Sequence, residues 1–223
     1  MLFFRVRILA DIFNEIDEDI RRERYQKLWK TYGKFLIFAV VIFFLGAAVY
    51  ITWNNYLENL KKKEGEIFSN SLEMIDKKSW DLASSNLYNL YSSSSSGYRA
   101  LAKLQHASVL LQNKKADDAI EIYKNLVEDP KSDIIFRDLA RYLIVIHTFD
   151  FEKDSEITKH LSYLLDKDNP WYYSAMEIDG FRLIRLGKYK EAANIFVSLS
   201  DNTEAPSGIR MRSAEMLVNL KNR

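Results

Sequence analysis

The stretch from Phe35 to Trp53, FLIFAVVIFFLGAAVYITW, contains no Asp, Glu, Lys, Arg or His. As a helix it would be roughly 28 Å long, close to the thickness of the hydrocarbon core of a bilayer. Core helices of soluble proteins seldom run this far without a polar residue, and the stretch lies too far into the chain to be the apolar part of a signal peptide. The sequence therefore predicts a transmembrane helix, which we place at residues 34–57.

Aromatic and basic residues flank this stretch, as expected where a helix leaves the bilayer. The predicted membrane-interface residues are Trp29, Tyr32, Lys34, Tyr50, Trp53 and Tyr56. Six Lys or Arg lie in the fifteen or so residues before the span and three in the same length after it. The positive-inside rule then puts the N-terminus in the cytoplasm. We expect a single-pass protein of a bacterial inner membrane, with its larger C-terminal part in the periplasm.

The segment before the span, residues 1–33, has an amphipathic helical pattern with Ile12, Ile16 and Ile20 four residues apart. Acidic residues precede basic ones, an order that favours a helix through side-chain pairs and the helix dipole. The bases lie next to the span, where anionic lipid headgroups attract them. We expect a cytoplasmic juxtamembrane segment, and contact with lipid alone or also with a cytoplasmic partner remains open.

The composition indicates an all-α domain at residues 58–223. The whole chain has seven Gly and three Pro in 223 residues, which favours long helices over strands and turns. Its net charge of +1 gives no indication of a nucleic-acid partner. The chain has no Cys, so it has neither disulfides nor thiolate chemistry.

Internal repeats organise this domain. The clearest unit lies in residues 173–206 and carries Gly180, Leu183, Gly187, Tyr189, Ala192, Phe196 and Leu199. This spacing matches the tetratricopeptide repeat, a helix-turn-helix of about 34 residues. Small residues let two antiparallel helices approach closely, larger ones fill the seam, and Gly187 suits a turn that needs a positive φ.

Further units follow the same template. One contains Ala107, Leu110, Ala119, Tyr123 and Leu126; a weaker one spans residues 64–96 and ends in a serine-rich connector at Ser92 to Ser96; and a degenerate one has extra residues around Phe149 to Asp154. The small residues expected in the second helices, at Ala83, Ala119, Ile157 and Ala192, recur every 35 to 38 residues, with Ile157 as the poor member. We predict an α-solenoid of about four helix pairs capped by a helix at residues 207–220. An irregular helical bundle is the alternative.

Repeat stacks of this type bind partners on the concave face formed by the first helix of each pair. The predicted groove residues are Phe68, Leu72, Ile75, Leu101, Leu104, Leu111, Arg137, Arg141, Ile144, Phe181, Ile184 and Arg185. Most are apolar, and an exposed apolar groove would suit hydrophobic segments of other chains. Alternatively, the capping helix or the curvature of the stack buries these residues.

The sequence contains no recognisable catalytic, nucleotide-binding or metal-binding motif. Its histidines, His106, His147 and His160, are scattered over different predicted helices and are expected to be packing or surface residues. We therefore expect a non-enzyme with no catalytic residue, cofactor or metal.

The order of these parts, with the juxtamembrane stretch IDEDIRRERYQKLWKTYGKFLI, resembles a bacterial family of membrane-anchored, periplasmic tetratricopeptide-repeat-like proteins. These accompany the Sec translocon (SecYEG) as an ancillary subunit, and the stretch is similar to that of alphaproteobacterial members. The resemblance implies a scaffold whose partners are translocon subunits, periplasmic chaperones or exported proteins. The alternative is a structural protein of the cell envelope or division machinery that self-associates, and the oligomeric state is left open.

Overall fold

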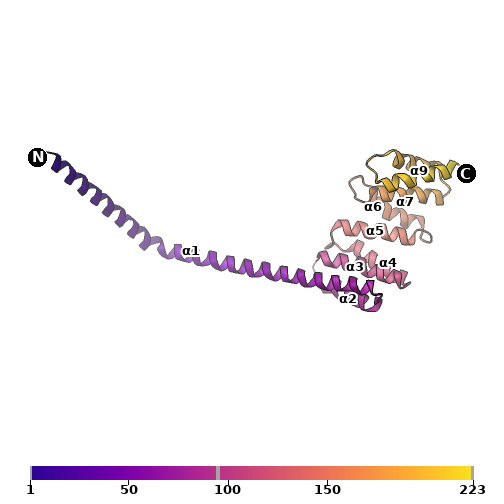
Figure 1. Ribbon diagram of the computed structural model, residues 1–223, viewed down its shortest axis with the longest axis horizontal. Coiled ribbons are helices and arrows are strands. Elements are labelled where there is room, and N and C mark those ends of the chain that lie inside the picture. Colours follow the sequence, from indigo (N-terminus) through magenta and orange to yellow (C-terminus); the bar gives the residue numbers. More distant parts are fainter. Residues whose placement is uncertain (1, 94–95, 222–223) are drawn as a thin grey trace. The chain divides into compact units, whose positions relative to one another are not determined.

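The computed structural model describes residues 2–93 and 96–221, with the backbone alone for residues 2–25 and 96. Within these ranges the chain forms helices and no strands (Figure 1). The helices are α1 (Leu2–Asp76), α2 (Trp80–Ser93), α3 (Ser96–Gln112), α4 (Ala116–Glu128), α5 (Ile134–Thr148), α6 (Asp154–Leu164), α7 (Tyr172–Arg185), α8 (Tyr189–Asp201) and α9 (Ser207–Lys221). The prediction of an all-α chain is confirmed for this part of the chain.

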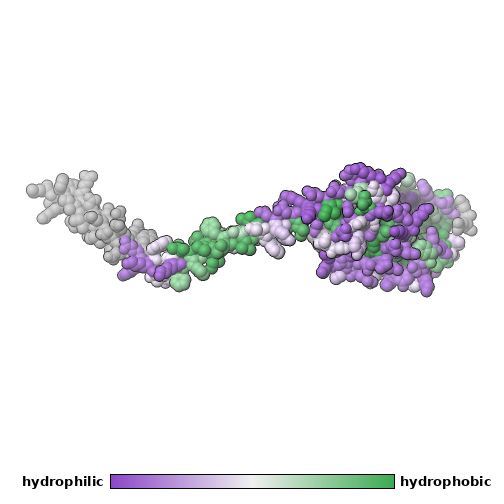
Figure 2. Space-filling model, turned by 90° about the horizontal axis from the view of Figure 1, so that it is seen from below, coloured by the Kyte–Doolittle hydropathy of each residue, from purple (hydrophilic) through white to green (hydrophobic). Residues whose placement is uncertain are grey.

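The chain divides into two compact units, Met1–Leu60 and Lys61–Arg223, and α1 contributes to both. The first unit holds the apolar stretch, whose most apolar window of 18 residues has a mean hydropathy of 2.7 and is not buried at all. Phe35 and Phe43 are 74% and 71% exposed. Among the described helices, α1 alone is long and apolar enough to cross a membrane (Figure 2). A core helix would bury such residues, so their exposure favours the predicted span.

In the second unit each helix from α2 to α9 packs against the next one along the chain, and α3 also contacts α5 and α7 contacts α9. The order of these helices along the unit can be followed in Figure 1. Four core clusters lie between neighbouring helices. The first includes Leu87 of α2 and Val109 of α3, and the end of α1 packs against it. The second includes Tyr123 and joins α3, α4 and α5. The third includes Ile157 and joins α5, α6 and α7, and the fourth includes Phe196 and joins α7, α8 and α9.

The same turn closes three helix pairs. Lys78, Lys114 and Gly187 have left-handed φ angles of 58°, 60° and 73°. In each turn the following N–H donates to the carbonyl five residues earlier, from Ser79 to Met74 (2.8 Å), from Lys115 to Leu110 (2.9 Å) and from Lys188 to Leu183 (2.8 Å). This pattern is the Schellman motif, which satisfies carbonyls at a helix end. The motif prefers Gly in the left-handed position, so two of these turns depend on Lys in a less favourable conformation.

The four residues predicted to recur in the second helices, three Ala and one Ile, occupy equivalent places. Ala83, Ala119, Ile157 and Ala192 are all 0% exposed. The N–H of each donates to the carbonyl four residues earlier, at Ser79, Lys115, Lys153 and Lys188 respectively. The degenerate unit therefore keeps the register of the others although Ile157 is larger than Ala.

The turn of this third unit differs, as the sequence indicates. Helix α5 ends at Thr148 and α6 begins at Asp154, so residues 149–153 separate them. The first of these, Phe149, has right-handed angles (φ −52°, ψ −40°) in place of the left-handed residue of the other turns. The longer connection moves Phe149 beside α7, where it packs against the third core cluster.

The predicted serine connector needs a correction. Ser92 and Ser93 belong to α2 and Ser96 begins α3, while residues 94–95 lie outside the described residues. The hydroxyls of Ser92 and Ser93 donate to the carbonyls of Tyr88 (2.8 Å) and Asn89 (2.9 Å). Serine in the last turn of a helix can bond the preceding turn in this way, so a run of serines does not by itself end a helix.

Gly180 allows the close approach of α7 and α8. A Cβ atom at this position would lie 2.7 Å from Cζ of Phe196. We predict that Gly180→Ala lowers the free energy of unfolding by about 1 to 3 kcal/mol, because a filled core resists an extra methyl group. The midpoint of thermal unfolding, followed by circular dichroism of the full-length protein in detergent, should fall by several degrees.

The matched control for this prediction is Gly97→Ala in α3. Nothing lies within 4 Å of a Cβ atom at Gly97, so the midpoint should stay the same or rise slightly as helix propensity improves. Equal midpoints for the Gly180 variant and the unmodified protein would contradict the prediction.

Candidate functional site: an apolar cavity between α5 and α7

The structure places most of the predicted groove residues against the core. Phe68 and Ile75 pack against the first core cluster, and Leu104 and Leu111 against the second. Leu101 and Arg137 are half-buried, and Arg137 Nε donates to the carbonyl of Val127 at 2.9 Å. The side chain of Leu72 is 36% exposed.

Two predicted groove residues belong to the interior, which corrects the prediction for them. Ile144 is 2% exposed and lies in the second core cluster. Arg141 is 6% exposed; its Nη1 donates to Asp138 Oδ1 at 2.7 Å, and its Cζ lies 4.4 Å from the ring centre of Tyr163. Neither is available to a partner, because α5 packs against α4 through Ile144 and Arg141 is covered by Tyr163 of α6.

The remaining three, Phe181, Ile184 and Arg185, line one cavity of about 500 Å³. It is bounded on the α7 side by these residues and Ile178, and on the α5 side by Ile146, Phe149 and Asp150. Phe149 and Ile178 pack against the third core cluster, and Phe181 and Ile184 against the fourth. The cavity therefore lies at the junction of two core clusters. Its volume falls within the roughly 300 to 1,000 Å³ of small ligand pockets.

Arg185 closes one side of the cavity, and its positive charge is already used. Its Cζ lies 4.8 Å from the ring centre of Phe149, its Nη1 donates to the carbonyl of Phe149, and its Nη2 lies 3.7 Å from Asp154 Oδ1. A guanidinium engaged in this way stacks on the ring and offers little charge to a ligand. The cavity is consequently more apolar than its residue types suggest.

A second arginine of α7 fixes the start of α6 beside the cavity. Nη1 of Arg182 donates to both carboxylate oxygens of Asp154 at 3.1 Å, and its Nε donates to Asp179 at 2.7 Å. Burial alone would lower the pKa of the Arg182 guanidinium, but the hydrogen bonds to Asp179 and Asp154 outweigh burial and raise it. These bonds hold the longer α5–α6 connection, and with it Phe149, against α7.

Asp150 is the uncommitted charge of this site. It lines the cavity and is exposed, and none of the described residues forms an ion pair with it. Since the arginines are paired with Asp154 and Asp179, the rim has a negative electrostatic bias. An apolar group accompanied by a positive charge is the chemistry that fits. No group of three or more His, Asp or Glu among the described residues could hold a metal ion.

The sequence interpretation missed Ile146, Phe149, Asp150 and Ile178. For Ile178 a signal exists, since it lies three residues before Phe181 and seven before Arg185, on one helical face. For Phe149 and Asp150 the sequence shows only the irregular length of the turn. Their place in the cavity depends on the tertiary contacts with α7.

The residues predicted for the membrane interface lie on α1 in the first unit. Trp29, Tyr32, Tyr50, Trp53 and Tyr56 are each at least 60% exposed, and Lys34 is also exposed. Trp53 and Tyr56 lie next to each other on one face, with ring centres 6.1 Å apart.

Comparison with known proteins gives one match. A family model described as "Tetratricopeptide repeat-like domain" matches residues 26–205, which include the candidate span and the α5–α7 cavity. Domains of this kind are typically protein-interaction modules without catalytic activity. Neither the curated proteins nor the solved structures include a match to the chain.

We predict that the cavity binds a neutral apolar dye such as Nile red, and that Ile146→Asp weakens the binding by about tenfold. The new carboxylate would lie in the cavity near Asp150 and would lose hydration when the dye binds. Dye fluorescence would be titrated with residues 61–223 expressed alone, after circular dichroism has shown that helicity is retained.

Ile135→Asp is the matched control. Ile135 and Ile146 are both on α5 and are 45% and 43% exposed, but only Ile146 lines the cavity. Equal weakening by both variants, or by neither, would show that the dye does not bind in this cavity.

Proposed function

The chain belongs to the tetratricopeptide repeat-like domain family, and we propose that it is a non-enzymatic scaffold that is tethered to a membrane and binds other proteins. The observation that carries the proposal is the apolar cavity between α5 and α7. It is lined by Phe181 and Ile184, is closed by an arginine whose charge is already paired, and has Asp150 at its rim. We infer that it accepts an apolar segment of a partner with a basic residue nearby.

We further propose that the helix pairs stack as a solenoid. Sequential packing from α2 to α9 and the repeated turn at Lys78, Lys114 and Gly187 support this arrangement. In such a stack the first helices of the pairs, including α3, α5 and α7, form the inner face. The α5–α7 cavity would then lie on that face, and the half-buried Leu101, Leu104 and Leu111 would extend it.

The proposed tether is residues 34–57, with residues 1–33 in the cytoplasm and residues 58–223 in the periplasm. The exposed apolar segment of α1 supports the tether, and the excess of Lys and Arg before it supports the orientation. The exposed aromatic residues at both ends are suited to the two headgroup regions. In this arrangement the repeat unit would meet proteins on the outer side of the inner membrane.

The orientation can be tested without background because the chain has no Cys. We predict that Ser198→Cys, on the exposed surface of α8, reacts with a membrane-impermeant maleimide in cells whose outer membrane has been made permeable. Asn14→Cys, before the span, should react only after the inner membrane is dissolved by detergent. The reverse pattern would invert the orientation, and labelling of both positions in intact spheroplasts would argue against a span.

We propose the Sec translocon as the site of action. The resemblance in the juxtamembrane stretch and the family membership support this choice, because a tethered binding domain on the outer side of the translocon would meet chains as they emerge. Periplasmic chaperones and exported proteins are the further partners that this position implies.

We predict that the tagged full-length protein, extracted in mild detergent, co-purifies with translocon subunits. Ile146→Asp should reduce the recovery of exported proteins and chaperones but not of the translocon, if the span provides the attachment. Quantitative mass spectrometry measures the recovery of the translocon subunits and that of the exported proteins and chaperones, with Ile135→Asp as the matched control. Absence of translocon subunits would count against the assignment to export.

Self-association is the second candidate, and one observation favours it. Met211 and Val218 lie seven residues apart on α9, on the same helical face, and are 63% and 61% exposed, so this helix presents two apolar side chains that a second copy could cover. Recovery of a second, differently tagged copy of the chain in place of translocon subunits would support this alternative.

A further inference from the structure

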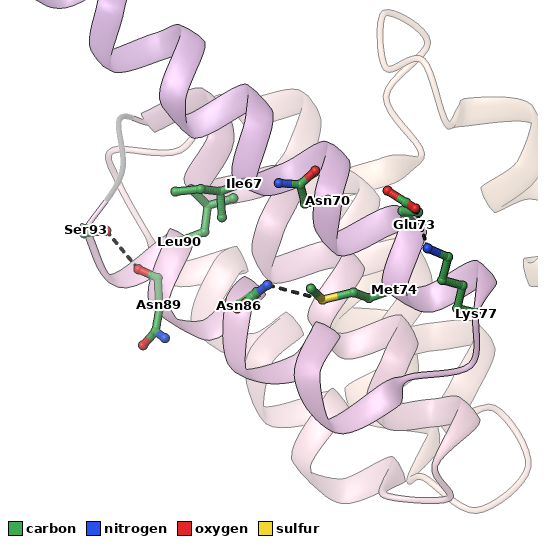
Figure 3. A pocket seen from close by; sticks show the side chains of 9 residues that line it. All are labelled: Ile67, Asn70, Glu73, Met74, Lys77, Asn86, Asn89, Leu90 and Ser93. Atoms are coloured by element: carbon green, nitrogen blue, oxygen red, sulfur yellow. Dashed lines mark hydrogen bonds and ion pairs between the residues drawn. The ribbon is translucent and has the colours of Figure 1, made fainter.

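A second cavity, of about 460 Å³, lies between the end of α1 and α2 inside the second unit (Figure 3). Three amide side chains line it, those of Asn70 from α1 and of Asn86 and Asn89 from α2. Its apolar lining comes from Ile67, Met74 and Leu90. We call this cavity the amide groove. It is separate from the α5–α7 cavity, with which it shares no residue.

The residues that line the amide groove are spaced so that they lie on one side of each helix. Ile67, Asn70 and Met74 follow one another at steps of three and four residues, so they share one face of α1. On α2, Asn89 and Leu90 lie three and four residues after Asn86, so these residues also lie on one side of their helix. The turn at Lys78 brings these faces side by side in antiparallel order. Asn70 and Asn86 therefore bring amide side chains from both helices of the pair, whereas the Asn89 amide points away from them (Figure 3).

The hydrogen-bonding groups of the amide groove are largely uncommitted. Asn86 Nδ2 donates to Met74 Sδ at 3.3 Å, and a thioether is a weak acceptor, so the Oδ1 atom and the second N–H remain available. Among the described residues, none forms a hydrogen bond with the side-chain amide of Asn70 or of Asn89. The charged residues at one end, Glu73 and Lys77, are bonded to each other. The groove thus offers neutral donors and acceptors and little net charge.

This chemistry distinguishes between two kinds of polypeptide ligand. The main chain of a helix satisfies its own N–H and C=O groups, so a docked helix would cover the asparagines without pairing them. An amide that is buried without a hydrogen-bond partner weakens binding, because it gives up its bonds to water and gains none in return. An extended segment has free main-chain N–H and C=O groups, and a primary amide carries the same two kinds of group. An extended segment can therefore pair with the asparagines, while its apolar side chains contact Ile67 and Leu90.

We propose that the amide groove binds an extended, uncharged polypeptide segment through its main chain. Recognition of the main chain depends little on sequence, since every residue other than proline presents the same groups. The proposal does not rest on the α5–α7 cavity, which selects an apolar segment by its side chains and by Asp150. The two sites would act on different properties of a partner.

The experiment uses the full-length protein in lipid nanodiscs and a capped, dye-labelled octapeptide of alternating Ser and Val. Its twin has the same side chains but an N-methyl group on every second main-chain nitrogen. We expect fluorescence anisotropy to show binding of the unmodified peptide and binding about tenfold or more weaker for the twin, because several main-chain donors are lost. Empty nanodiscs measure binding to lipid.

Asn70→Leu with Asn86→Leu should weaken binding of the unmodified peptide by about tenfold, and the single change Asn70→Leu by a few-fold. Asn70 is exposed, so the single variant should fold even if the double variant does not. Asn194→Leu, the same change on an exposed position of α8, should leave binding unchanged.

Several outcomes would overturn the proposal. One is equal affinity for the peptide and its N-methylated twin, which would assign recognition to side chains. Another is no effect of Asn70→Leu in a variant of normal helicity. A third is tighter binding of an amphipathic helical peptide than of the extended one, when that binding is sensitive to Asn70→Leu. Failure of the unmodified peptide to bind above the level of empty nanodiscs would do the same.

Discussion

The close approach of the two helices in each pair depends on the residue that faces the partner near the start of the second helix. At Ala83, Ala119 and Ala192 this residue is small and completely buried, and the Schellman turn before it sets the helices antiparallel. At Ile157 the same register carries a larger side chain, and the turn before it is longer. The α5–α7 cavity borders on this irregular unit. The departure from the repeat and the candidate binding site are thus parts of one local arrangement.

Two arginines of α7, Arg182 and Arg185, fix the position of the α5–α6 connection in the irregular unit. The connection between α5 and α6 lacks the left-handed turn of the other pairs, and the N–H groups of Phe151 and Glu152 donate instead to the carbonyl of Thr148. Arg182 and Arg185 hold this connection against α7 by bonding to Asp154 and to the carbonyl of Phe149. The ion pairs of Arg182 and Arg185 remain partly exposed to solvent, which weakens them. We therefore expect them to stabilise the fold less than the packing of Phe149 and Ile178 on the third core cluster does. These bonds have two main effects. They hold Phe149 in position against α7, and they neutralise the positive charges of the two arginines, so that Asp150 gives the rim of the cavity its negative charge.

Much of this fold could be predicted because its signals are local. The apolar stretch from Phe35, the helical periodicity and the recurring small residues each depend on neighbours within about one repeat. The family match agrees with the predicted repeats. The burial of Arg141 and Ile144 could not be predicted in the same way. Both lie at positions that a regular repeat would expose, and only the approach of Tyr163 and of the second core cluster covers them. Lys78 and Lys114 are a further example, since packing imposes on them a turn that their residue type disfavours.

The division of the interior into four core clusters affects how the repeat unit opens. Because each cluster joins only neighbouring helices, the unit is expected to unfold locally and in segments, with amide-exchange protection that varies along the chain. The α5–α7 cavity lies where the third cluster meets the fourth. A bound segment would contact both at once and would therefore couple their opening. Occupancy would then be visible as greater cooperativity of unfolding across α5 to α9, even at sites that the ligand does not touch.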